Sequence, residues 1–303
     1  MNSEAVVDNE AAGAGAQEPR AVLVGLLGRG IQLSRSPAMH EAEGAAQGIN
    51  YQYKLFDTAG MAPDVDIEDI LKSAETCGFA GLNVTFPYKV AIIEHLDELS
   101  DAARALGAVN TVVFRDGRRR GHNTDWWGFA ESFRRNMPGA KCDAVLQIGA
   151  GGAGAAVAHA LLEQGVGELR IFDRDPEKSG ALEQRINSSA AHGRARAVST
   201  LEEGLDGVVD GLVNASPVGM ASMPGTPVPA GAILPTMWVA DIVYFPLETE
   251  LLRIAREKGC HVLPGSGMAV FQAVRAFEHF TALVPDSDRM EAAFNRFDSK
   301  DRA

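Results

Sequence analysis

Four short clusters of polar residues in the first half of the chain carry groups suited to a small hydroxylated acid. They are Ser34-Arg35-Ser36, Asn83-Val84-Thr85 with Lys89, Asn110-Thr111, and Asn123-Thr124-Asp125. Each lies in a loop after a segment that we expect to be a strand, and ligands bind at strand ends in open α/β sheets. Hydroxyl and amide groups hold ligand hydroxyls, and serines near a helix N-terminus can bind a carboxylate. The lysine and the aspartate supply groups that could take or give an alcohol proton.

Each cluster also has a purely structural interpretation. Ser36 could cap the helix that follows it, Asn110 could occupy a turn, and Asp125 could cap the next helix. Lys89 taken alone is more often a solvated surface cation. Four such clusters ahead of one nucleotide-binding motif favour a binding site over four unrelated structural features.

A glycine-rich turn in the second half has the pattern of a dinucleotide-binding loop. Gly149, Gly151 and Gly154 give G-x-G-x-x-G, between an apolar strand expected at 144–148 and an alanine-rich helix. Glycines allow the tight turn and the close approach of backbone to pyrophosphate, and the helix N-terminus favours negative charge. The motif alone is weak in a chain with 32 glycines, and the alternative is an ordinary strand–helix turn. The strand before it and the helix after it favour the nucleotide site.

The acidic residue after the next strand bears on the choice of nucleotide. Asp173 is expected at the end of that strand, where a carboxylate accepts hydrogen bonds from the ribose hydroxyls of NAD. The same carboxylate would repel the 2′-phosphate of NADP. Arg174 and Lys178 act in the opposite sense, because cations there could hold a phosphate, although Arg174 could also stack on adenine. We therefore expect NAD to be preferred, with some use of NADP retained.

Composition and charge narrow the class of protein. The 303 residues are 46% hydrophobic and 22% charged, as in a soluble globular protein, and the net charge of -12 argues against a nucleic-acid surface. Cys77, Cys142 and Cys260 lie far apart, so neither a disulfide framework nor a metal site is expected. No segment approaches the roughly 18 apolar residues of a membrane span. The acidic N-terminus does not resemble a secretory signal, so we expect a disordered tail at 1–19 and a cytoplasmic protein.

The expected secondary structure alternates between strands and helices, which predicts an α/β fold. In the first half, strands are expected at 21–28, 51–56, 78–86 and 108–114, and at 118–125 after a hairpin turn at Asp116-Gly117. Helices are expected from Ser36, at 66–76 and at 88–100. A new unit begins near residue 127 with a helix at 127–137, followed by strands at 144–148, 168–173, 208–213, 238–243 and 260–265. Helices complete this unit at about 248–258 and from residue 267 onward.

Eight motifs in the chain resemble the successive motifs of the shikimate dehydrogenase family. They follow the family's order and cover nearly all of residues 21–283: LSRSPAMH, NVTFPYK, GAVNT, GHNTDWWGF, GAGGAG, NASPVGM, DIVYFPLETELL and GMAVFQAVRAFEHFTA. With the acid at position 173, the sequence is most similar to the bacterial NAD-dependent quinate/shikimate dehydrogenase branch. The resemblance implies reversible oxidation of shikimate to 3-dehydroshikimate, of quinate to 3-dehydroquinate, or of both.

The resemblance also implies an architecture of two α/β domains with a cleft between them. The substrate-binding domain would comprise residues 20–126 and 266–303, so the C-terminal helices would fold back onto it. Residues 127–265 would form a Rossmann-type NAD(P)-binding domain.

Site residues carried over from the family fall into three groups. Lys89 and Asp125 would be the catalytic pair at the reacting hydroxyl. Ser34 and Ser36 would bind the substrate carboxylate, and the ring hydroxyls would be held by Asn83, Thr85, Asn110 and Gln272. The cofactor would be bound by Gly149, Gly151, Gly152, Ala153, Gly154, Asp173, Arg174, Lys178, Asn214, Ala215, Ser216, Met220, Val243, Gly265 and Met268.

Two departures from the family pattern leave alternatives open. NADP-using biosynthetic members usually carry Asn-Arg-Thr or Asn-Arg-Ser where this chain has Asp173-Arg174-Asp175. Quinate-using relatives can have threonine where this chain keeps Ser36, which favours shikimate over quinate. The alternatives are the biosynthetic NADP-dependent enzyme, a relative acting on an aminated analogue, or a dinucleotide-sensing module without catalysis. The family includes monomers and dimers, and we expect one of these states, with no nucleic-acid, membrane or metal partner.

Overall fold

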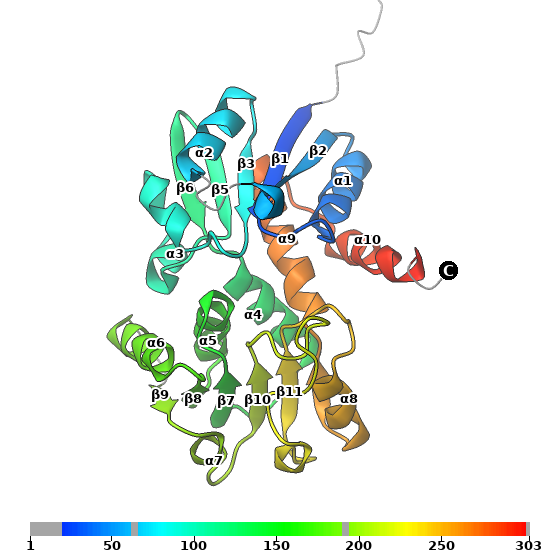
Figure 1. The fold of residues 1–303 in the computed structure, drawn as a ribbon. Coiled ribbons are helices and arrows are strands. Elements are labelled where there is room, and N and C mark those ends of the chain that lie inside the picture. Colours follow the sequence, from blue (N-terminus) through cyan, green and yellow to red (C-terminus); the bar gives the residue numbers. More distant parts are fainter. Residues whose placement is uncertain (1–19, 62–65, 190–193, 301–303) are drawn as a thin grey trace, which may run out of the picture.

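The computed structural model describes residues 20–61, 66–189 and 194–300 and contains two six-stranded sheets. Figure 1 shows the sheet of the first half of the chain above that of the second half, with α4 (Asp125–Asn136) between them. This arrangement confirms the predicted α/β fold class. The predicted tail at 1–19 lies outside the described residues.

The first sheet is mixed, with strand order β2-β1-β3-β5-β6-β4. β1 pairs in parallel with β2 and β3, so the carboxyl ends of these three strands meet at one edge. The β5–β6 hairpin turns at Asp116 and Gly117 as predicted, with φ of 53° and 72°. The strands are β1 (Ala21–Gly28), β2 (Asn50–Asp57), β3 (Gly81–Val84), β4 (Glu98–Leu99), β5 (Thr111–Arg115) and β6 (Arg118–His122).

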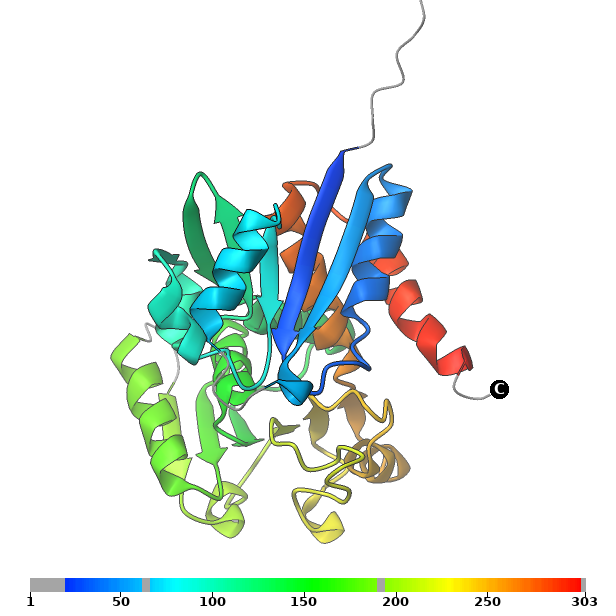
Figure 2. The ribbon, with the colours of Figure 1, turned by 45° about the horizontal axis from the view of Figure 1, so that its top comes forward.

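Helices cover both faces of the first sheet, as Figure 2 shows for α2 and α9. Leu71 of α2 packs with Leu82 of β3 on one face, and Phe277 of α9 stacks on Tyr51 of β2 on the other. α10 packs on α1 and α9, which confirms that the C-terminal helices fold back onto the first sheet. The helical elements of this half are α1 (Ser36–Ala46), η1 (Thr58–Gly60), α2 (Ile67–Thr76), η2 (Ala91–His95), α3 (Asp101–Leu106), α9 (Ser266–Thr281) and α10 (Ser287–Lys300).

The second sheet is parallel throughout and has the order β12-β11-β10-β7-β8-β9. This is the strand order of a Rossmann fold, with the order reversing at the first strand, β7. Its strands are β7 (Ala144–Ile148), β8 (Glu168–Phe172), β9 (Arg194–Val198), β10 (Gly211–Asn214), β11 (Trp238–Asp241) and β12 (His261–Leu263). The helices are α5 (Gly152–Glu163), α6 (Pro176–Ser189), α7 (Leu201–Gly204), η3 (Ala230–Ala232) and α8 (Glu250–Glu257).

Two glycines allow α4 and α9 to cross at close range. A Cβ on Gly128 of α4 would lie 2.7 Å from the backbone N of Gln272, and one on Gly267 would lie 2.1 Å from Ser132 Oγ. Since α4 begins at Asp125, this crossing fixes the start of α4 relative to Gln272 on α9. A larger residue at either glycine would push the two helices apart.

The helix predicted over 88–100 does not form, and that prediction is wrong. The carbonyl of Lys89 accepts from the backbone N of Val109 at 2.7 Å, so it is not available for a helical bond. The segment instead contains a turn, the short helix η2, and β4. Lys89 therefore lies in a turn after β3 and not on the first turn of a helix.

The boundary between the two proposed domains stays a prediction. β6 ends at His122 and β7 begins at Ala144, with α4 connecting the two sheets. Within the described ranges, no helix combines the length and the apolar character needed to cross a bilayer.

Candidate active site

Lys89 and Asp125 form the centre of the candidate site. Lys89 Nζ lies 2.7 Å from Asp125 Oδ2, and the two side chains are 21% and 9% exposed. Thr124 occupies the N-cap position of α4 without a side-chain cap bond, so Asp125 is the first helical residue and not the cap. A carboxylate is favoured at this position by the helix dipole. The pair is a charge-assisted hydrogen bond that leaves part of the ammonium accessible.

Two asparagine amides stand beside this pair and are buried. Asn110 Nδ2 donates to Asp125 Oδ1 at 2.9 Å, and Asn110 Oδ1 accepts from the backbone N of Thr124 at 2.7 Å. Asn83 Oδ1 accepts from Tyr53 Oη at 2.8 Å. Thr85 is half-buried and follows the end of β3. In an extended chain, residues two positions apart lie on the same face, so Thr85 is on the same side as Asn83. The structure thus brings Lys89, Asp125, Asn110 and Asn83 together.

The serines expected to bind a carboxylate lie at the start of α1. Arg35 occupies the N-cap position and Ser36 is the first helical residue, so the prediction of Ser36 as a possible cap is wrong. Burial raises the pKa of Tyr53, and the nearby Ser36 side chain counteracts part of that rise. Ser34 Oγ accepts from the backbone N of Ser36 at 3.3 Å. Both serine residues are only partly buried.

Arg35 and Gln272 connect the C-terminal helices to this half of the site. Arg35 Nη1 donates to the carbonyl of Phe294 at 3.1 Å, and its guanidinium lies 4.6 Å from the centre of the Phe294 ring. Gln272 Nε2 donates to the carbonyl of Ala269 at 3.0 Å. The serine loop is therefore held by α10, while Gln272 is placed by the crossing of α9 with α4.

The glycine loop has the geometry that close backbone approach requires. Gly149 has a φ of 106°, and a Cβ there would lie 2.6 Å from the carbonyl oxygen of Ala215. A Cβ on Gly154 would lie 2.3 Å from the carbonyl oxygen of Gly149. A Cβ on Gly151 or Gly152 would meet nothing within 4 Å, so the outer side of the loop is open. The loop leads into α5 at the point where the strand order reverses, which is where nucleotides bind in such sheets.

Gln147 is a residue of this loop that the sequence motif did not reveal. It is fully buried in β7, and its Nε2 donates to the carbonyls of Gly149 at 2.8 Å and Gly154 at 2.9 Å. The amide therefore ties the first and last glycines of the motif together. A polar residue inside an otherwise apolar strand was the signal available in the sequence.

Asp173 lies directly after β8 and faces the glycine loop. Its Oδ2 accepts from the backbone N of Ala150 at 2.7 Å, and its Oδ1 accepts from the backbone N of Asp175 at 2.9 Å. Arg174 is exposed, and Lys178 Nζ lies 3.5 Å from Asp175 Oδ2. The carboxylate is thus held where the acidic residue of a dinucleotide fold contacts the ribose.

Asn214 organises the loops after β10 and β11. Its Nδ2 donates to the carbonyl of Val218 at 2.7 Å and to Asp241 Oδ1 at 2.9 Å, and its Oδ1 accepts from Ser216 Oγ at 2.6 Å. Asp241 also accepts from the backbone N of Val243 at 3.0 Å, and burial raises its pKa to about 6. The side chain of Asn214 therefore shapes the loops that would contact a cofactor.

The remaining residues with predicted cofactor roles surround these loops. A Cβ on Gly265 would lie 2.4 Å from the carbonyl oxygen of Ile242, so the start of α9 packs closely on the loop after β11. The other residues with predicted cofactor roles lie at the start of α5, in the loops after β10 and β11, and at the start of α9: Ala153, Ala215, Met220, Val243 and Met268.

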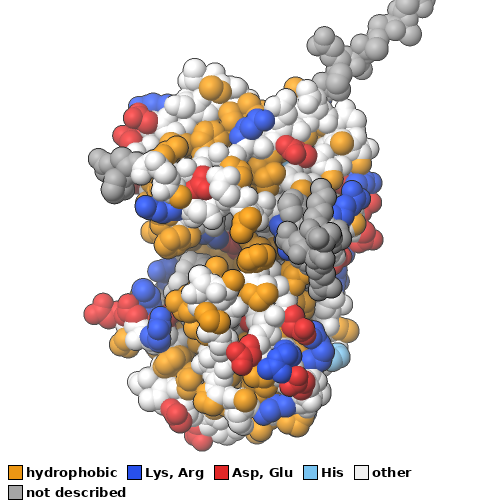
Figure 3. Space-filling view, turned by 45° about the vertical axis from the view of Figure 1, so that its right-hand side comes forward, with side chains coloured by type: hydrophobic (Ala, Val, Ile, Leu, Met, Phe, Trp, Pro, Cys, Tyr) orange, Lys and Arg blue, Asp and Glu red, His pale blue; other side chains and the backbone are white. Residues whose placement is uncertain are grey.

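Tyr244 shows that the two halves of the site face each other. It follows β11 of the second sheet, yet its ring centre lies 6.0 Å from that of Phe294 on α10, and Lys89, Asp125 and Arg35 affect its pKa. That pKa is raised, first because surrounding protein disfavours the phenolate and then because Asp125 is negatively charged. Figure 3 shows a recess between the two halves, bordered by hydrophobic side chains. Tyr244 was not predicted as a site residue, although it lies at a strand end in a quoted motif.

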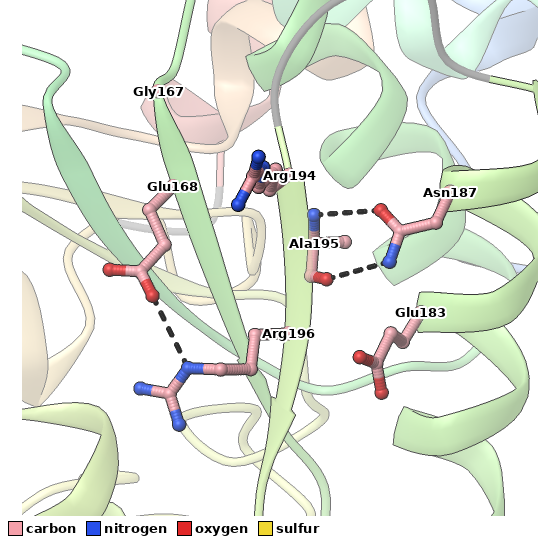
Figure 4. A pocket seen from close by; sticks show the side chains of 7 residues that line it. All are labelled: Gly167, Glu168, Glu183, Asn187, Arg194, Ala195 and Arg196. Carbon is pink, nitrogen blue, oxygen red and sulfur yellow. Dashed lines mark hydrogen bonds and ion pairs between the residues drawn. The ribbon is translucent and has the colours of Figure 1, made fainter.

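A separate hollow of about 690 Å³ lies at the outer edge of the second sheet (Figure 4). Glu168 Oε1 there pairs with Arg196 Nε at 3.2 Å, and Asn187 Nδ2 donates to the carbonyl of Ala195 at 2.9 Å. None of the predicted site residues lines it. We therefore do not assign the reaction to this hollow.

Comparison with known proteins gives concordant matches. The family model described as "Shikimate dehydrogenase substrate binding domain" matches residues 26–112. A shikimate dehydrogenase (NADP(+)) of Streptomyces avermitilis is 53% identical over 89% of this chain and 94% of its own length. A quinate/shikimate dehydrogenase (NAD(+)) of Corynebacterium efficiens is 48% identical over 90% of this chain and 97% of its own. The structure of quinate dehydrogenase from Corynebacterium glutamicum with NAD is 46% identical, with a TM-score of 0.87, covering 91% and 99% of the two chains.

Proposed function

Because this chain belongs to the shikimate dehydrogenase family, we propose that it catalyses the NAD-dependent, reversible oxidation of shikimate to 3-dehydroshikimate, and of quinate to 3-dehydroquinate. The observation that carries the proposal is the pair of Lys89 and Asp125, 2.7 Å apart, in a site that Tyr244 borders from the nucleotide-binding half. A non-catalytic nucleotide sensor would have no use for this pair.

The pair is suited to the alcohol–ketone interconversion. As the substrate is oxidised, the reacting carbon loses a hydride and the hydroxyl loses a proton. Lys89 would hydrogen-bond the reacting oxygen while Asp125 keeps the lysine side chain in place. As the neutral amine, Lys89 would receive the proton of the hydroxyl; as the ammonium, it would stabilise the developing alkoxide while the proton passes to water. Bound NAD supplies the acceptor for the hydride.

The other polar residues would hold the substrate by its two ends. We propose that Ser34 and Ser36 bind the carboxylate, and that the ring hydroxyls are bound by Asn83, Thr85, Asn110 and Gln272. In support, the buried amides of Asn83 and Asn110 are fixed by hydrogen bonds beside the Lys89–Asp125 pair. Ser36, which does not cap its helix, keeps a hydroxyl for this purpose.

The residues of the second half fit a dinucleotide. The space outside Gly151 and Gly152 is open to a pyrophosphate, and the N-terminus of α5 points at it. We propose that Asp173 receives the ribose hydroxyls and favours NAD. Use of NADP is the second candidate, because exposed Arg174 lies beside that carboxylate and a relative with 53% identity is named for NADP.

Steady-state kinetics on four combinations test this function, with shikimate or quinate as substrate and NAD or NADP as cofactor. We expect the highest kcat/KM with shikimate and NAD, and a value at least about tenfold lower with NADP, because Asp173 repels the 2′-phosphate. Absence of nucleotide reduction in all four combinations would contradict the proposed function. A preference for NADP would identify the biosynthetic alternative.

The cellular location and the oligomeric state of the protein are also proposals. We propose a cytoplasmic enzyme that is a monomer or a homodimer. Sedimentation equilibrium of the purified protein distinguishes the two assembly states.

A further inference from the structure

A continuous series of hydrogen bonds connects β2 with the catalytic pair. It includes two buried side chains, Tyr53 and Thr111, to which the proposed function gives no direct contact with the substrate; they are 5% and 0% exposed. We call this series the Tyr53–Lys89 network. Its members, in order, are Tyr53, Asn83, Thr111, Asn110, Asp125 and Lys89.

The direction of these hydrogen bonds is fixed at Asn110. The backbone N–H of Thr124 can only donate, and it lies 2.7 Å from Asn110 Oδ1. The Asp125 carboxylate can only accept, and its Oδ1 lies 2.9 Å from Asn110 Nδ2. The orientation of the Asn110 amide follows from these two partners. Thr111 Oγ1, 3.1 Å from Asn110 Oδ1, must therefore donate to it.

The same reasoning extends to Asn83 and Tyr53. Asn83 Nδ2 lies 3.0 Å from Thr111 Oγ1 and 3.3 Å from the carbonyl oxygen of Asn110, which can only accept. Asn83 Oδ1 consequently faces Tyr53, whose hydroxyl donates to it at 2.8 Å. Since the Tyr53 proton is used in this way, the Tyr53 oxygen can only accept from any further group. Every donor in the network points toward the Asp125 carboxylate, an arrangement in which successive bonds strengthen one another.

This direction limits what a substrate can present. Both N–H groups of Asn83 are used, so its remaining capacity toward a ligand is a lone pair on Oδ1. The ligand group beside Asn83 must therefore donate, as a hydroxyl does and a ketone does not.

We propose that Tyr53 and Thr111 are positioning residues that fix the Asn83 and Asn110 amides, and so require a donor hydroxyl at one point of the substrate and hold Asn110 in place beside the Lys89–Asp125 pair. This inference rests on the proposed function. Neither residue need touch the substrate, because each acts through an asparagine.

The first experiment compares Tyr53→Phe with Tyr51→Phe in the full-length enzyme. Tyr51 is a matched control: it is buried on the same strand and face, but its hydroxyl lies 3.0 Å from His40 Nδ1, outside the network. We expect Tyr53→Phe to raise KM for shikimate about tenfold, since Asn83 loses the buried hydrogen bond that fixes its amide oxygen. KM for NAD should change less than about twofold, and Tyr51→Phe should leave both KM values within about twofold.

The second experiment uses Thr111, which is the other link. Thr111→Val keeps the shape and removes both hydrogen bonds, and we expect kcat/KM for shikimate to fall about tenfold. Thr111→Ser restores the hydroxyl and should recover most of the loss. Thr281→Val is the control, because Thr281 is equally buried but bonds the carbonyl of Phe277 within α9.

A double-mutant cycle tests the coupling between Tyr53 and Thr111. Thr111→Val should lower kcat/KM for shikimate by a smaller factor in the Tyr53→Phe background than in wild type, because the Asn83 amide that both residues bond has already lost one hydrogen bond. Thermal unfolding of each variant shows whether it is folded at the assay temperature, and the Thr111 variants serve if Tyr53→Phe is not.

The outcomes separate the two claims. Wild-type enzyme inert toward shikimate and quinate would overturn the proposed function and this inference with it. An active wild type in which Tyr53→Phe behaves as Tyr51→Phe, or in which Thr111→Ser does not recover activity, would overturn the inference alone. The expected KM increase with an unchanged KM for NAD, together with non-additivity in the cycle, would support it.

Discussion

At the scale of single residues, Asp173 shows how one carboxylate can select a nucleotide. It is held by the backbone N–H groups of Ala150 and Asp175, one on each oxygen. Those contacts keep the negative charge at the edge of the glycine loop. A ribose hydroxyl can donate to it there, whereas a 2′-phosphate would be repelled.

Replacing Asp173 by alanine should therefore weaken the preference for NAD. We expect the ratio of kcat/KM for NAD to that for NADP to fall about tenfold or more, because the repulsion of the 2′-phosphate is removed. Asp175→Ala is the matched control, since it removes the same charge from the same loop. If both variants changed the ratio equally, net charge and not the position of Asp173 would be responsible.

Residue positions in the motifs were largely predictable, whereas their hydrogen-bond partners were not. The sequence indicated Lys89, Asp125 and Asn110 by residue type, and the structure places them in direct contact. Tyr53 and Gln147 went unnoticed because each lies inside a strand whose other residues suggested core packing. A polar side chain in a buried strand is informative only once its partner, distant in sequence, is known.

At the scale of elements, the packing of α1 on β2 buries a histidine side chain in its neutral form. His40 is fully buried, its Nδ1 lies 3.0 Å from Tyr51 Oη, and its Nε2 has no hydrogen-bond partner among the described residues. Burial lowers the pKa of His40 to about 3. The folded protein therefore excludes a proton that the unfolded chain binds below its ordinary pKa of about 6.5.

Stability should consequently fall as the pH drops from about 6.5 toward 3. The unfolded state binds more protons in this window, so the free energy of unfolding decreases by up to about 1.4 kcal/mol per pH unit for this group. Urea unfolding across this range should show a smaller slope for His40→Gln than for wild type. His261→Gln, at an exposed position of β12, is the control. An unchanged slope in His40→Gln would contradict the role given to His40.

Helices and strands were predicted correctly where the hydrophobic periodicity was strong. They were predicted wrongly where contacts between residues distant in sequence determine the backbone conformation. The glycine loop, α5 and the β5–β6 hairpin follow from local sequence. The expected helix at 88–100 fails because the carbonyl of Lys89 bonds to Val109, which local sequence does not show. Ser36 loses its expected cap position because α1 begins after Arg35, which is held by α10 through Phe294.

At the scale of the whole molecule, function depends on two sheets that present their carboxyl-end loops to one another. The first sheet supplies Lys89 and the start of α4 supplies Asp125, while the second sheet supplies the glycine loop and Tyr244. α4 and α9 cross at Gly128 and set the geometry between these parts. The motifs in the sequence indicate each half of the site separately. The position of Tyr244 near Lys89 depends on how the two halves pack together, which the motifs do not show.

The most direct test of the account is the turnover of Lys89→Ala with shikimate and NAD, measured beside the affinity for NAD. We expect kcat to fall by about 10²- to 10⁴-fold, because the group that stabilises the developing alkoxide and handles its proton is lost. NAD affinity should remain within about twofold, since Lys89 lies in the other half of the site. Lys72→Ala, at an exposed lysine of α2, should retain wild-type turnover. Lys89→Ala with turnover close to wild type would contradict the assignment of the Lys89–Asp125 pair as the catalytic centre.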